Sequence, residues 1–437
     1  MSMLFNEITD IIKKEKLGEE SIFTPSYTSG IDIMDYYNAY EDKDGIVTGF
    51  EGGRLITIIG KSGSGKTSFG IEMACSIVND YEEGSIIHYD FERATNLARV
   101  KTISGWDDET INNKYKNLKN NIYSESIFQI IKAIEQKKNE PSVYEAIKID
   151  TGKTDREGNP IYVLPPTVIL LDSWALMIPR DISEEEKLSG SMSASAIAKQ
   201  NNAVIKRILG PMERGNITLI VINHITQKIE INSFAKTQSA VNYLKQDESV
   251  PGGSSCIYLA NNLIKLTTST KLDKDSTYGI KGFIVVGEFI KSRSSEAGRK
   301  FEMIFEQSVG FNNALTNLHN LKEMGYLKGS PRAYFFEDLP EVKFTLKTFM
   351  EKYNENEELR QVVKNLVKEA YDGIVFKSGL STNNLETPSE NEEDEEEEVY
   401  LESCVDEEND IWKGSDGNYY NSDGEPVDFP KKKKNKK

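Results

Sequence analysis

The sequence predicts an α/β protein in which a mostly parallel, doubly wound sheet surrounds a phosphate-binding loop. Residues 55–59 are mostly apolar, as expected of a buried strand, and they lead into Gly-Lys-Ser-Gly-Ser-Gly-Lys-Thr at 60–67. Further apolar strands that end in polar residues follow along the chain. Apolar side chains recur at helical spacing directly after the loop, at Phe69, Met73, Ala74, Ile77 and Val78. Strand, loop and helix in this order are typical of a nucleotide-binding core.

The loop fits G-x-x-x-x-G-K-[ST], in which backbone N–H groups surround nucleotide phosphates at distances that only glycine permits. We expect Lys66 to reach the β- and γ-phosphates and the Thr67 hydroxyl to hold Mg²⁺. The N-terminus of the following helix also favours anions. The alternative is a Gly/Ser turn that binds nothing. The predicted nucleotide-binding residues are Gly60, Lys61, Ser62, Gly63, Ser64, Gly65, Lys66 and Thr67.

Composition limits the class of protein. The 437 residues suffice for one large α/β domain with smaller attachments, and no signal peptide or apolar run near 18 residues is present. We therefore expect a soluble, cytoplasmic protein that does not engage a membrane. Cys75, Cys256 and Cys404 lack metal-type spacing, and the three histidines argue against a His-rich metal site. Cys75 is predicted to be a small core residue.

The net charge of −17 is concentrated near the C-terminus. Residues 386–410 contain 14 acidic side chains and no Lys or Arg, and removing these 14 charges from −17 leaves −3 for the remainder. The nearly balanced remainder does not exclude nucleic-acid binding.

Two strands of the predicted sheet end in carboxylates. Residues 85–90 run into Glu92, which at the carboxyl end of a strand beside the loop would orient the water that attacks a γ-phosphate. A helix N-terminal acid or a surface salt bridge is the alternative for Glu92. Residues 167–173 contain four apolar positions followed by Asp172, the Walker B pattern, whose carboxylate helps to hold Mg²⁺.

Three later strands are predicted at 218–222, 262–268 and 282–290, and another at 300–307. The first ends in Asn223-His224, and His224 is either a core or tautomer-locked histidine or a polar sensor that reaches toward the γ-phosphate. The strand at 282–290 ends in Lys291-Ser292-Arg293. Helices are predicted at 94–104, at 125–138 and through 204–209. Residues 139–166 are predicted to form a polar hairpin or loop.

The stretch 227–256 is long and polar and ends in Pro251-Gly252-Gly253. Basic residues interleaved with aromatic ones suit single-stranded nucleic acid, in which bases stack and phosphates attract cations. A flexible excursion with ordinary surface charges is the alternative. The residues concerned are Lys228, Phe234, Lys236, Tyr243 and Lys245.

The sequence divides into four parts. Residues 1–45 comprise an amphipathic helix and a lead-in expected to dock on a neighbouring protomer, 46–310 the ATPase core, and 311–377 a small mixed lobe. Residues 378–437 form an acidic and then basic tail that we expect to be disordered, because its composition buries too little apolar surface to offset the ordering entropy. Trp412, Tyr419, Tyr420 and Phe429 form a candidate small patch within it.

This ordered set of motifs resembles the RecA-family homologous recombinases, most closely the phage UvsX-type branch, over residues 25–330. The resemblance implies a RecA-like P-loop NTPase core that binds ATP and Mg²⁺, with Glu92 as catalytic glutamate and His224 as γ-phosphate sensor. It implies that Lys291 and Arg293 reach across to a neighbour's ATP, and that Asp172 is associated with Mg²⁺. The insertion at 139–166 is not a standard part of that family.

The resemblance also implies two DNA-binding loops, at 181–200 and 227–255. They match the family by position and character rather than residue by residue. The implied DNA-binding residues are Lys228, Phe234, Lys236, Tyr243, Lys245, Gly252 and Gly253.

We therefore expect an ATP-dependent recombinase that forms helical filaments on single-stranded DNA, pairs with duplex DNA and exchanges strands in recombination, repair and recombination-dependent replication. Its implied partners are further copies of itself, a single-strand-binding protein and a loading mediator, in the host cytoplasm if the protein comes from a phage. A hexameric replicative helicase shares this core, and a DNA-independent ATP-binding scaffold is a non-enzymatic alternative. The Gly-Gly-terminated loop and the absence of a large N-terminal domain favour the recombinase.

Overall fold

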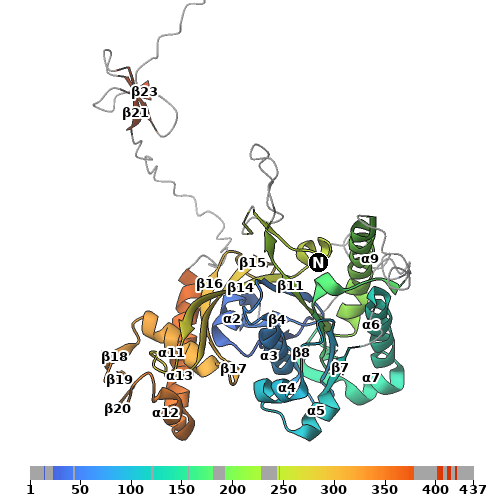
Figure 1. The fold of residues 1–437 in the computed structure, drawn as a ribbon, viewed down its shortest axis with the longest axis horizontal. Coiled ribbons are helices and arrows are strands. Elements are labelled where there is room, and N and C mark those ends of the chain that lie inside the picture. Colours follow the sequence, from blue (N-terminus) through green and yellow to red (C-terminus); the bar gives the residue numbers. More distant parts are fainter. Residues whose placement is uncertain are drawn as a thin grey trace, which may run out of the picture. The chain divides into compact units, whose positions relative to one another are not determined.

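A nine-stranded, mostly parallel sheet forms the centre of the protein (Figure 1). The computed structural model describes residues 14, 23–42, 45–119, 123–155, 157–180, 192–227, 244–245 and 247–377, with three strands between 401 and 420. The strand order is β17-β16-β15-β14-β5-β11-β10-β6-β7; the pairs from β14 to β7 are parallel, and those from β14 to β17 are antiparallel. In chain order the strands are β5 (Leu55–Gly60), β6 (Ser85–Asp90), β7 (Tyr115–Leu118), β10 (Thr167–Asp172), β11 (Ile217–His224), β14 (Asn262–Leu272), β15 (Gly282–Ser292), β16 (Lys300–Glu306) and β17 (Gly310–Phe311). The predicted mostly parallel α/β core is confirmed.

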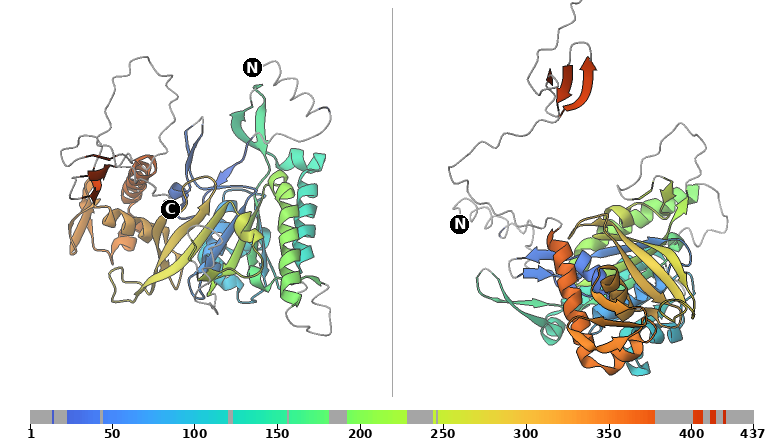
Figure 2. Two further views of the ribbon diagram at one scale, coloured as in Figure 1. Left: turned by 90° about the horizontal axis from the view of Figure 1, so that it is seen from above. Right: turned by 90° about the vertical axis from the view of Figure 1, so that its left-hand side faces the viewer.

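Helices cover both faces of this sheet because side chains alternate along each buried strand. One face packs on α3 (Lys66–Val78), whereas the other packs on α6 (Ser124–Lys138), α9 (Met192–Arg214) and α10 (Ser255–Tyr258). Leu170 belongs to the first buried cluster, and its neighbour Leu171 to the second. Helices α6 and α9 run side by side along their face (Figure 2).

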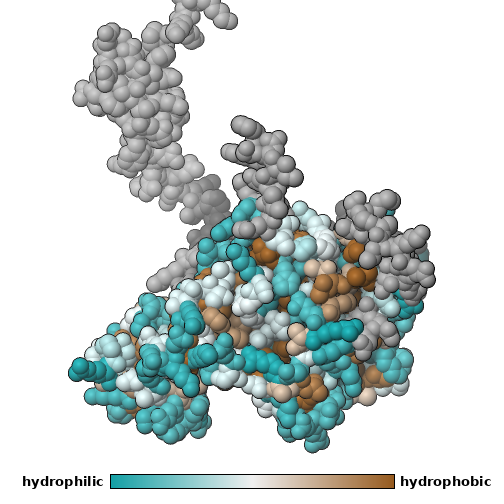
Figure 3. Space-filling view, in the orientation of Figure 1, coloured by the Kyte–Doolittle hydropathy of each residue, from teal (hydrophilic) through white to brown (hydrophobic). Residues whose placement is uncertain are grey.

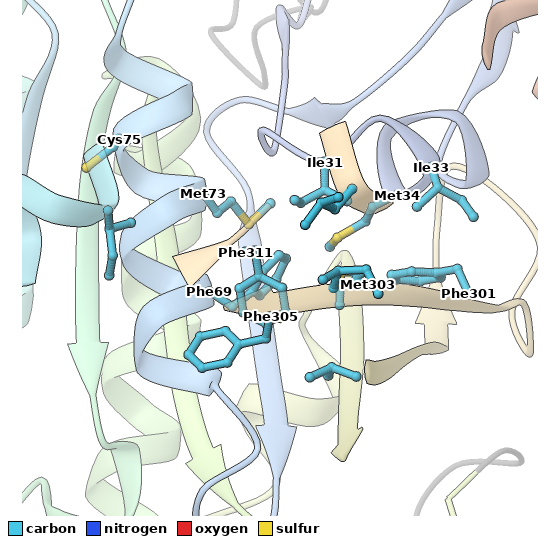
Figure 4. Close-up of a cluster of buried hydrophobic side chains, with 14 of the residues drawn as sticks. Ile31, Ile33, Met34, Phe69, Met73, Cys75, Phe301, Met303, Phe305 and Phe311 are labelled. Carbon is cyan, nitrogen blue, oxygen red and sulfur yellow. The ribbon is translucent and has the colours of Figure 1, made fainter. Parts of the chain in front are cut away.

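The segments flanking the core share its first buried cluster. The lead-in contains β1 (Ser26–Tyr27), paired with β4 (Phe50–Glu51), then α2 (Asp32–Tyr37) and the hairpin of β2 (Tyr40–Asp42) and β3 (Gly45–Val47). Phe69 and Met73 of α3 lie beside Phe305 and Phe311, with the α2 residue Met34 close by (Figure 4). The rings of Phe69 and Phe311 are 5.3 Å apart, centroid to centroid. The predicted N-terminal amphipathic helix lies outside the described residues, apart from Lys14.

Residues beyond β17 form a mixed set of elements, as predicted, whose apolar residues join the same cluster. They comprise α11 (Asn313–Glu323), the antiparallel sheet of β18 (Leu327–Ser330), β19 (Ala333–Phe336) and β20 (Leu339–Phe344), and the helices α12 (Phe349–Glu355) and α13 (Glu357–Lys377). The surface of this part, at the left of Figure 3, is mainly hydrophilic. None of the helices that the structure describes is long and apolar enough to cross a membrane.

Two helical predictions need correction. The sequence predicts a loop over 181–200, but α9 already begins at Met192, where Ala194, Ala196 and Ala198 favour helix; residues 181–191 lie outside the described residues. The helix expected over 94–104 begins at Leu97 as α4 (Leu97–Ser104) and is followed by α5 (Asp108–Lys114), which the sequence analysis did not predict. Within 139–166 the predicted hairpin is confirmed as β8 (Ile149–Thr154) and β9 (Pro160–Val163), preceded by α7 (Pro141–Ile147). Cys75 is buried in α3, as predicted.

The tail also departs from the prediction. Strands β21 (Leu401–Asp406), β22 (Ile411–Gly414) and β23 (Tyr419–Tyr420) form a three-stranded antiparallel sheet within a separate unit, residues 382–437. The expectation of disorder from 378 to 437 is therefore wrong for these strands. Their β-branched and aromatic residues have the strand propensity that the surrounding acidic residues lack.

Candidate nucleotide site at the carboxyl edge of the sheet

Four neighbouring parallel strands bring the predicted nucleotide-binding residues to one edge of the sheet. His224 at the end of β11 is level with Gly60 at the end of β5, and Asp172 at the end of β10 is level with Asp90 at the end of β6. Because all four strands point the same way, the residues that follow their ends meet above this edge. Glu92 follows β6 there, and its backbone N–H donates to the Asp172 carbonyl oxygen at 3.2 Å.

The loop between β5 and α3 has a backbone that requires glycine. Gly63 and Gly65 have φ angles of 77° and 86°, in the left-handed region. A Cβ atom on Gly65 would lie 3.2 Å from the Phe311 ring, and one on Gly60 would lie 2.6 Å from the Leu266 carbonyl oxygen. Gly65 is the N-cap of the 13-residue helix α3, whose first N–H groups point out of the helix. This geometry suits a phosphate group.

Lys66 is the cation of this loop. Its ammonium donates a 2.7 Å hydrogen bond to the Lys61 carbonyl oxygen and is largely buried. Burial lowers the pKa of Lys66, while Asp172 and Glu92 act in the opposite direction. An anion within the loop would therefore stabilise the charged ammonium.

Thr67 and Asp172 form a ligand set that fits Mg²⁺. The Thr67 hydroxyl donates a 2.6 Å hydrogen bond to Asp172 Oδ2, while Asp172 Oδ1 is buried without a hydrogen-bond partner. Burial raises the pKa of Asp172 to about 6, and Glu92 adds to the rise. An unpartnered buried carboxylate oxygen beside a hydroxyl fits a hard divalent cation, which prefers oxygen ligands. No cluster of three or more His, Cys, Asp or Glu side chains that would enclose a metal by itself occurs in the described part of the chain.

Glu92 and His224 contact each other across the same edge. His224 Nε2 lies 2.8 Å from Glu92 Oε1, and both side chains are about one-third exposed, at 35% and 30%. Because a carboxylate only accepts, Nε2 must carry the proton. Because a third of its side chain is exposed, His224 is not a core histidine, while its contact to Glu92 fixes its tautomer. Glu92 does not cap a helix, since Asn96 caps α4, and its contact to His224 is the ion pair that the alternative interpretation predicted. The pair leaves a carboxylate oxygen available for water next to the phosphate loop.

Arg99 on α4 flanks the phosphate loop and was not predicted. Its guanidinium donates to the Ser68 hydroxyl at 3.3 Å and to the Gln307 carbonyl oxygen at 3.0 Å. This contact ties the first turn of α3 to the segment after β16. No local sequence pattern marks Arg99, because Gln307 lies 208 residues away.

Residues 248–255, which we call the return arm, pack against the ends of β10 and β11. The Trp174 indole N–H donates to the Gly252 carbonyl oxygen at 2.7 Å, and the Asn223 amide donates to the Pro251 carbonyl oxygen at 2.8 Å. Gly252 and Gly253 have φ angles of 89° and 104°. A Cβ on Gly252 would lie 2.6 Å from the Trp174 ring, and one on Gly253 would lie 2.7 Å from Asn202 of α9. Both glycines are thus explained by close packing.

A buried ion pair fixes the start of the return arm. Glu248 on β13 (Glu248–Ser249) accepts from Lys265 of β14, with both carboxylate oxygens 2.7 Å from the ammonium. Strand β13 pairs with β12 (Thr226–Gln227), which follows His224. Lys245 is exposed. The other predicted DNA-binding side chains, Lys228, Phe234, Lys236 and Tyr243, lie outside the described residues.

Lys291 and Arg293 lie at the opposite edge of the sheet. Lys291 pairs with Leu263, which in turn pairs with Thr57 of β5. Thr57 precedes Gly60 by three residues, so Lys291 is level with a point about 10 Å along the strand from the start of the phosphate loop. Both cations donate to the Tyr258 carbonyl oxygen at the end of α10, Lys291 at 2.5 Å and Arg293 at 3.3 Å. Burial, helped by the charge of Arg293, lowers the pKa of Lys291 to about 8.

The chain was also compared with known proteins. No family model matches it, and no curated protein matches it.

Proposed function

We propose that this chain is a DNA-dependent ATPase and homologous recombinase of the RecA type, which assembles with further copies of itself on single-stranded DNA. The observation that carries the proposal is the attachment of the return arm to the nucleotide edge. Trp174 and Asn223 hold the arm. Trp174 lies two residues after the candidate magnesium ligand Asp172, and Asn223 directly precedes the candidate sensor His224. A change at the nucleotide would therefore reach the return arm, which is the end of the segment 227–255 that we assign to DNA.

The residues at this edge supply the parts needed for hydrolysis. Bound Mg²⁺ would neutralise phosphate charge, held by Thr67 and Asp172. Lys66 would exchange the Lys61 carbonyl oxygen for the β- and γ-phosphates. Glu92 would orient the attacking water through its free oxygen and accept its proton, while His224 holds the other oxygen in place.

The positions of Lys291 and Arg293 support assembly. Because they lie at the edge away from their own phosphate loop, they would act on the nucleotide of an adjacent copy, as arginine fingers supplied in trans do. Their present partner, a backbone carbonyl, is a weak competitor for a triphosphate. The complete site on this proposal needs two protomers.

Electron microscopy and ATPase assays, each with and without single-stranded DNA, test the proposal. We expect ATP-dependent helical filaments on DNA and hydrolysis that rises when DNA is added. Closed rings would instead indicate a hexameric helicase, and hydrolysis indifferent to DNA would indicate a scaffold. Lys66→Ala is the control: it should abolish both assembly and hydrolysis, since it removes the cation of the loop.

A further inference from the structure

Asn38, directly after α2, is a fully buried amide that connects three distant segments. Its Oδ1 accepts hydrogen bonds from the Asn262 amide at 2.6 Å and from the Ser292 hydroxyl at 3.0 Å. Its Nδ2 donates to the Gly49 carbonyl oxygen at 2.7 Å. The lead-in, the start of β14 and the end of β15 are thereby joined through one side chain.

The Ser292 hydroxyl also organises the turn that follows β15. Its oxygen accepts from the backbone N–H groups of Ser294 at 3.3 Å and Ser295 at 3.0 Å. The Arg293 N–H donates to the Asn261 carbonyl oxygen at 3.0 Å. The Ser292 hydroxyl therefore sets the path of the backbone that follows it, through Arg293, while Lys291 directly precedes it at the end of β15.

A second contact joins the same loop to the lead-in. Arg299, which follows the turn, donates to the Tyr37 carbonyl oxygen at 3.4 Å, one residue before Asn38. The direction in which Lys291 and Arg293 leave the sheet is thus determined by the lead-in as well as by their own strand.

We propose that Asn38, acting through the Ser292 hydroxyl, is a positioning residue that aims Lys291 and Arg293 at the nucleotide of a neighbouring protomer. This inference rests on the proposed function. A cation supplied in trans must arrive in a narrow geometry, since a displacement of about 1 Å at a reacting centre can cost roughly 10²-fold in rate. Asn38 supplies that geometry without touching the nucleotide itself.

Complementation between full-length variants tests this role. A reference mixture combines Glu92→Gln, which has intact cations but a defective hydrolytic site, with Lys291→Ala/Arg293→Ala, which has the converse defect. Ser292→Ala removes the hydroxyl and is expected to lower DNA-dependent hydrolysis about 10-fold or more, whereas Ser292→Thr keeps the hydroxyl and should remain within about twofold of the native rate. Asn38→Ala should resemble Ser292→Ala, and thermal unfolding checks that each variant is folded.

The direction of rescue decides the result. If Asn38 and Ser292 position the cations, a mixture of Ser292→Ala and Glu92→Gln recovers activity. In that mixture the correctly placed Lys291 and Arg293 of Glu92→Gln act on the intact hydrolytic site of Ser292→Ala. Ser292→Ala gains nothing from Lys291→Ala/Arg293→Ala. The reverse pattern, or native activity of Ser292→Ala alone, overturns the positioning role while the proposed function stands. A reference mixture that fails to recover, in filaments shown to contain both variants, overturns both the inference and the trans arrangement on which it rests.

Discussion

The Trp174 indole N–H donates a 2.7 Å hydrogen bond to the Gly252 carbonyl oxygen, 78 residues along the chain. Trp174 lies two residues after Asp172, so this bond links the candidate magnesium ligand to the return arm. Trp174→Phe keeps an aromatic ring but removes the donor. We expect it to lower stability by about 0.5–1.5 kcal/mol, the net contribution of a typical hydrogen bond, because the part-buried carbonyl of Gly252 loses its donor.

The same variant tests communication between the two segments. Stimulation of its ATPase by single-stranded DNA should fall several-fold, while ATP affinity without DNA stays near native. Titrations of ATPase rate against DNA, compared with nucleotide binding measured without DNA, separate the two effects. Full stimulation in the folded variant would contradict a coupling role for this bond.

Glu92→Gln tests the chemistry of the site. Glutamine keeps the shape of the side chain and a contact to His224 but loses the negative charge that orients water. ATP and DNA binding should persist, while hydrolysis falls by roughly 10²-fold or more. Single-turnover hydrolysis on preformed filaments provides the measurement, and a native rate would refute the assignment of Glu92.

Lys291 should make assembly dependent on pH. Its pKa of about 8 means that the ammonium loses its proton above that pH, whereas a neighbour's phosphates favour the charged form. ATP-dependent assembly should therefore weaken as pH rises above about 8, by at most roughly tenfold per pH unit for one proton per contact.

Lys291→Arg is the matched control for that prediction. Arginine stays charged throughout this range, so its assembly should lose the pH dependence. Light scattering between about pH 7 and pH 9.5 follows both proteins. Identical pH profiles would exclude Lys291 as the titrating group.

The buried pair of Lys265 and Glu248 predicts a difference between single and double variants. Each side chain is only 9% exposed. Lys265→Met leaves a buried carboxylate unpaired and should cost about 3–5 kcal/mol of stability. Lys265→Met combined with Glu248→Gln should recover much of this loss in urea unfolding, whereas equal losses in both proteins would count against the ion pair.

The acidic tail is predicted to compete with DNA for basic residues such as Lys245. Neutralising only the acids between 386 and 398 leaves β21–β23 unchanged and should tighten duplex binding and lower the Mg²⁺ requirement. The difference should shrink as ionic strength rises through about 0.15 M, where the Debye length is about 8 Å. Unchanged duplex affinity at low salt and low Mg²⁺ would refute the competition.

A chain ending at Thr382 is the second arm of that test. It also removes the basic residues 431–437 and the small sheet. If it binds duplex more tightly than native but the neutralised chain does not, the effect belongs to the sheet or the basic run rather than to the acids.

The sequence predicted the residues of the candidate site where a local pattern, such as an apolar strand followed by polar residues, also fixes where those residues lie in the fold. Thr67 and Asp172 are 105 residues apart, yet each follows a recognisable parallel strand, and such strands end at the same edge. Arg99, Asn38 and Trp174 carried no such signal. Their partners are chosen by how the chain packs, which periodicity along the sequence does not specify.

Strand β7 and the strands β21–β23 were missed for a different reason. Strand β7 has only four residues, too few for an alternating pattern to be recognised. The strands β21–β23 lie within a stretch whose average composition is strongly acidic, so their short apolar runs were outweighed. Averaging over a long segment conceals short ordered pieces.

The lengths of the two outermost strands restrict how copies can associate. Strand β7 ends the central sheet on one side with four residues, and β17 ends it on the other with two. Edges this short present few unpaired backbone N–H and C=O groups, so a strand from another copy would find few hydrogen-bond partners there. Growth into an open-ended polymer by strand addition is thereby discouraged. Assembly through the central sheet would therefore use side-chain surfaces, whose contacts can be made and broken as a bound nucleotide changes.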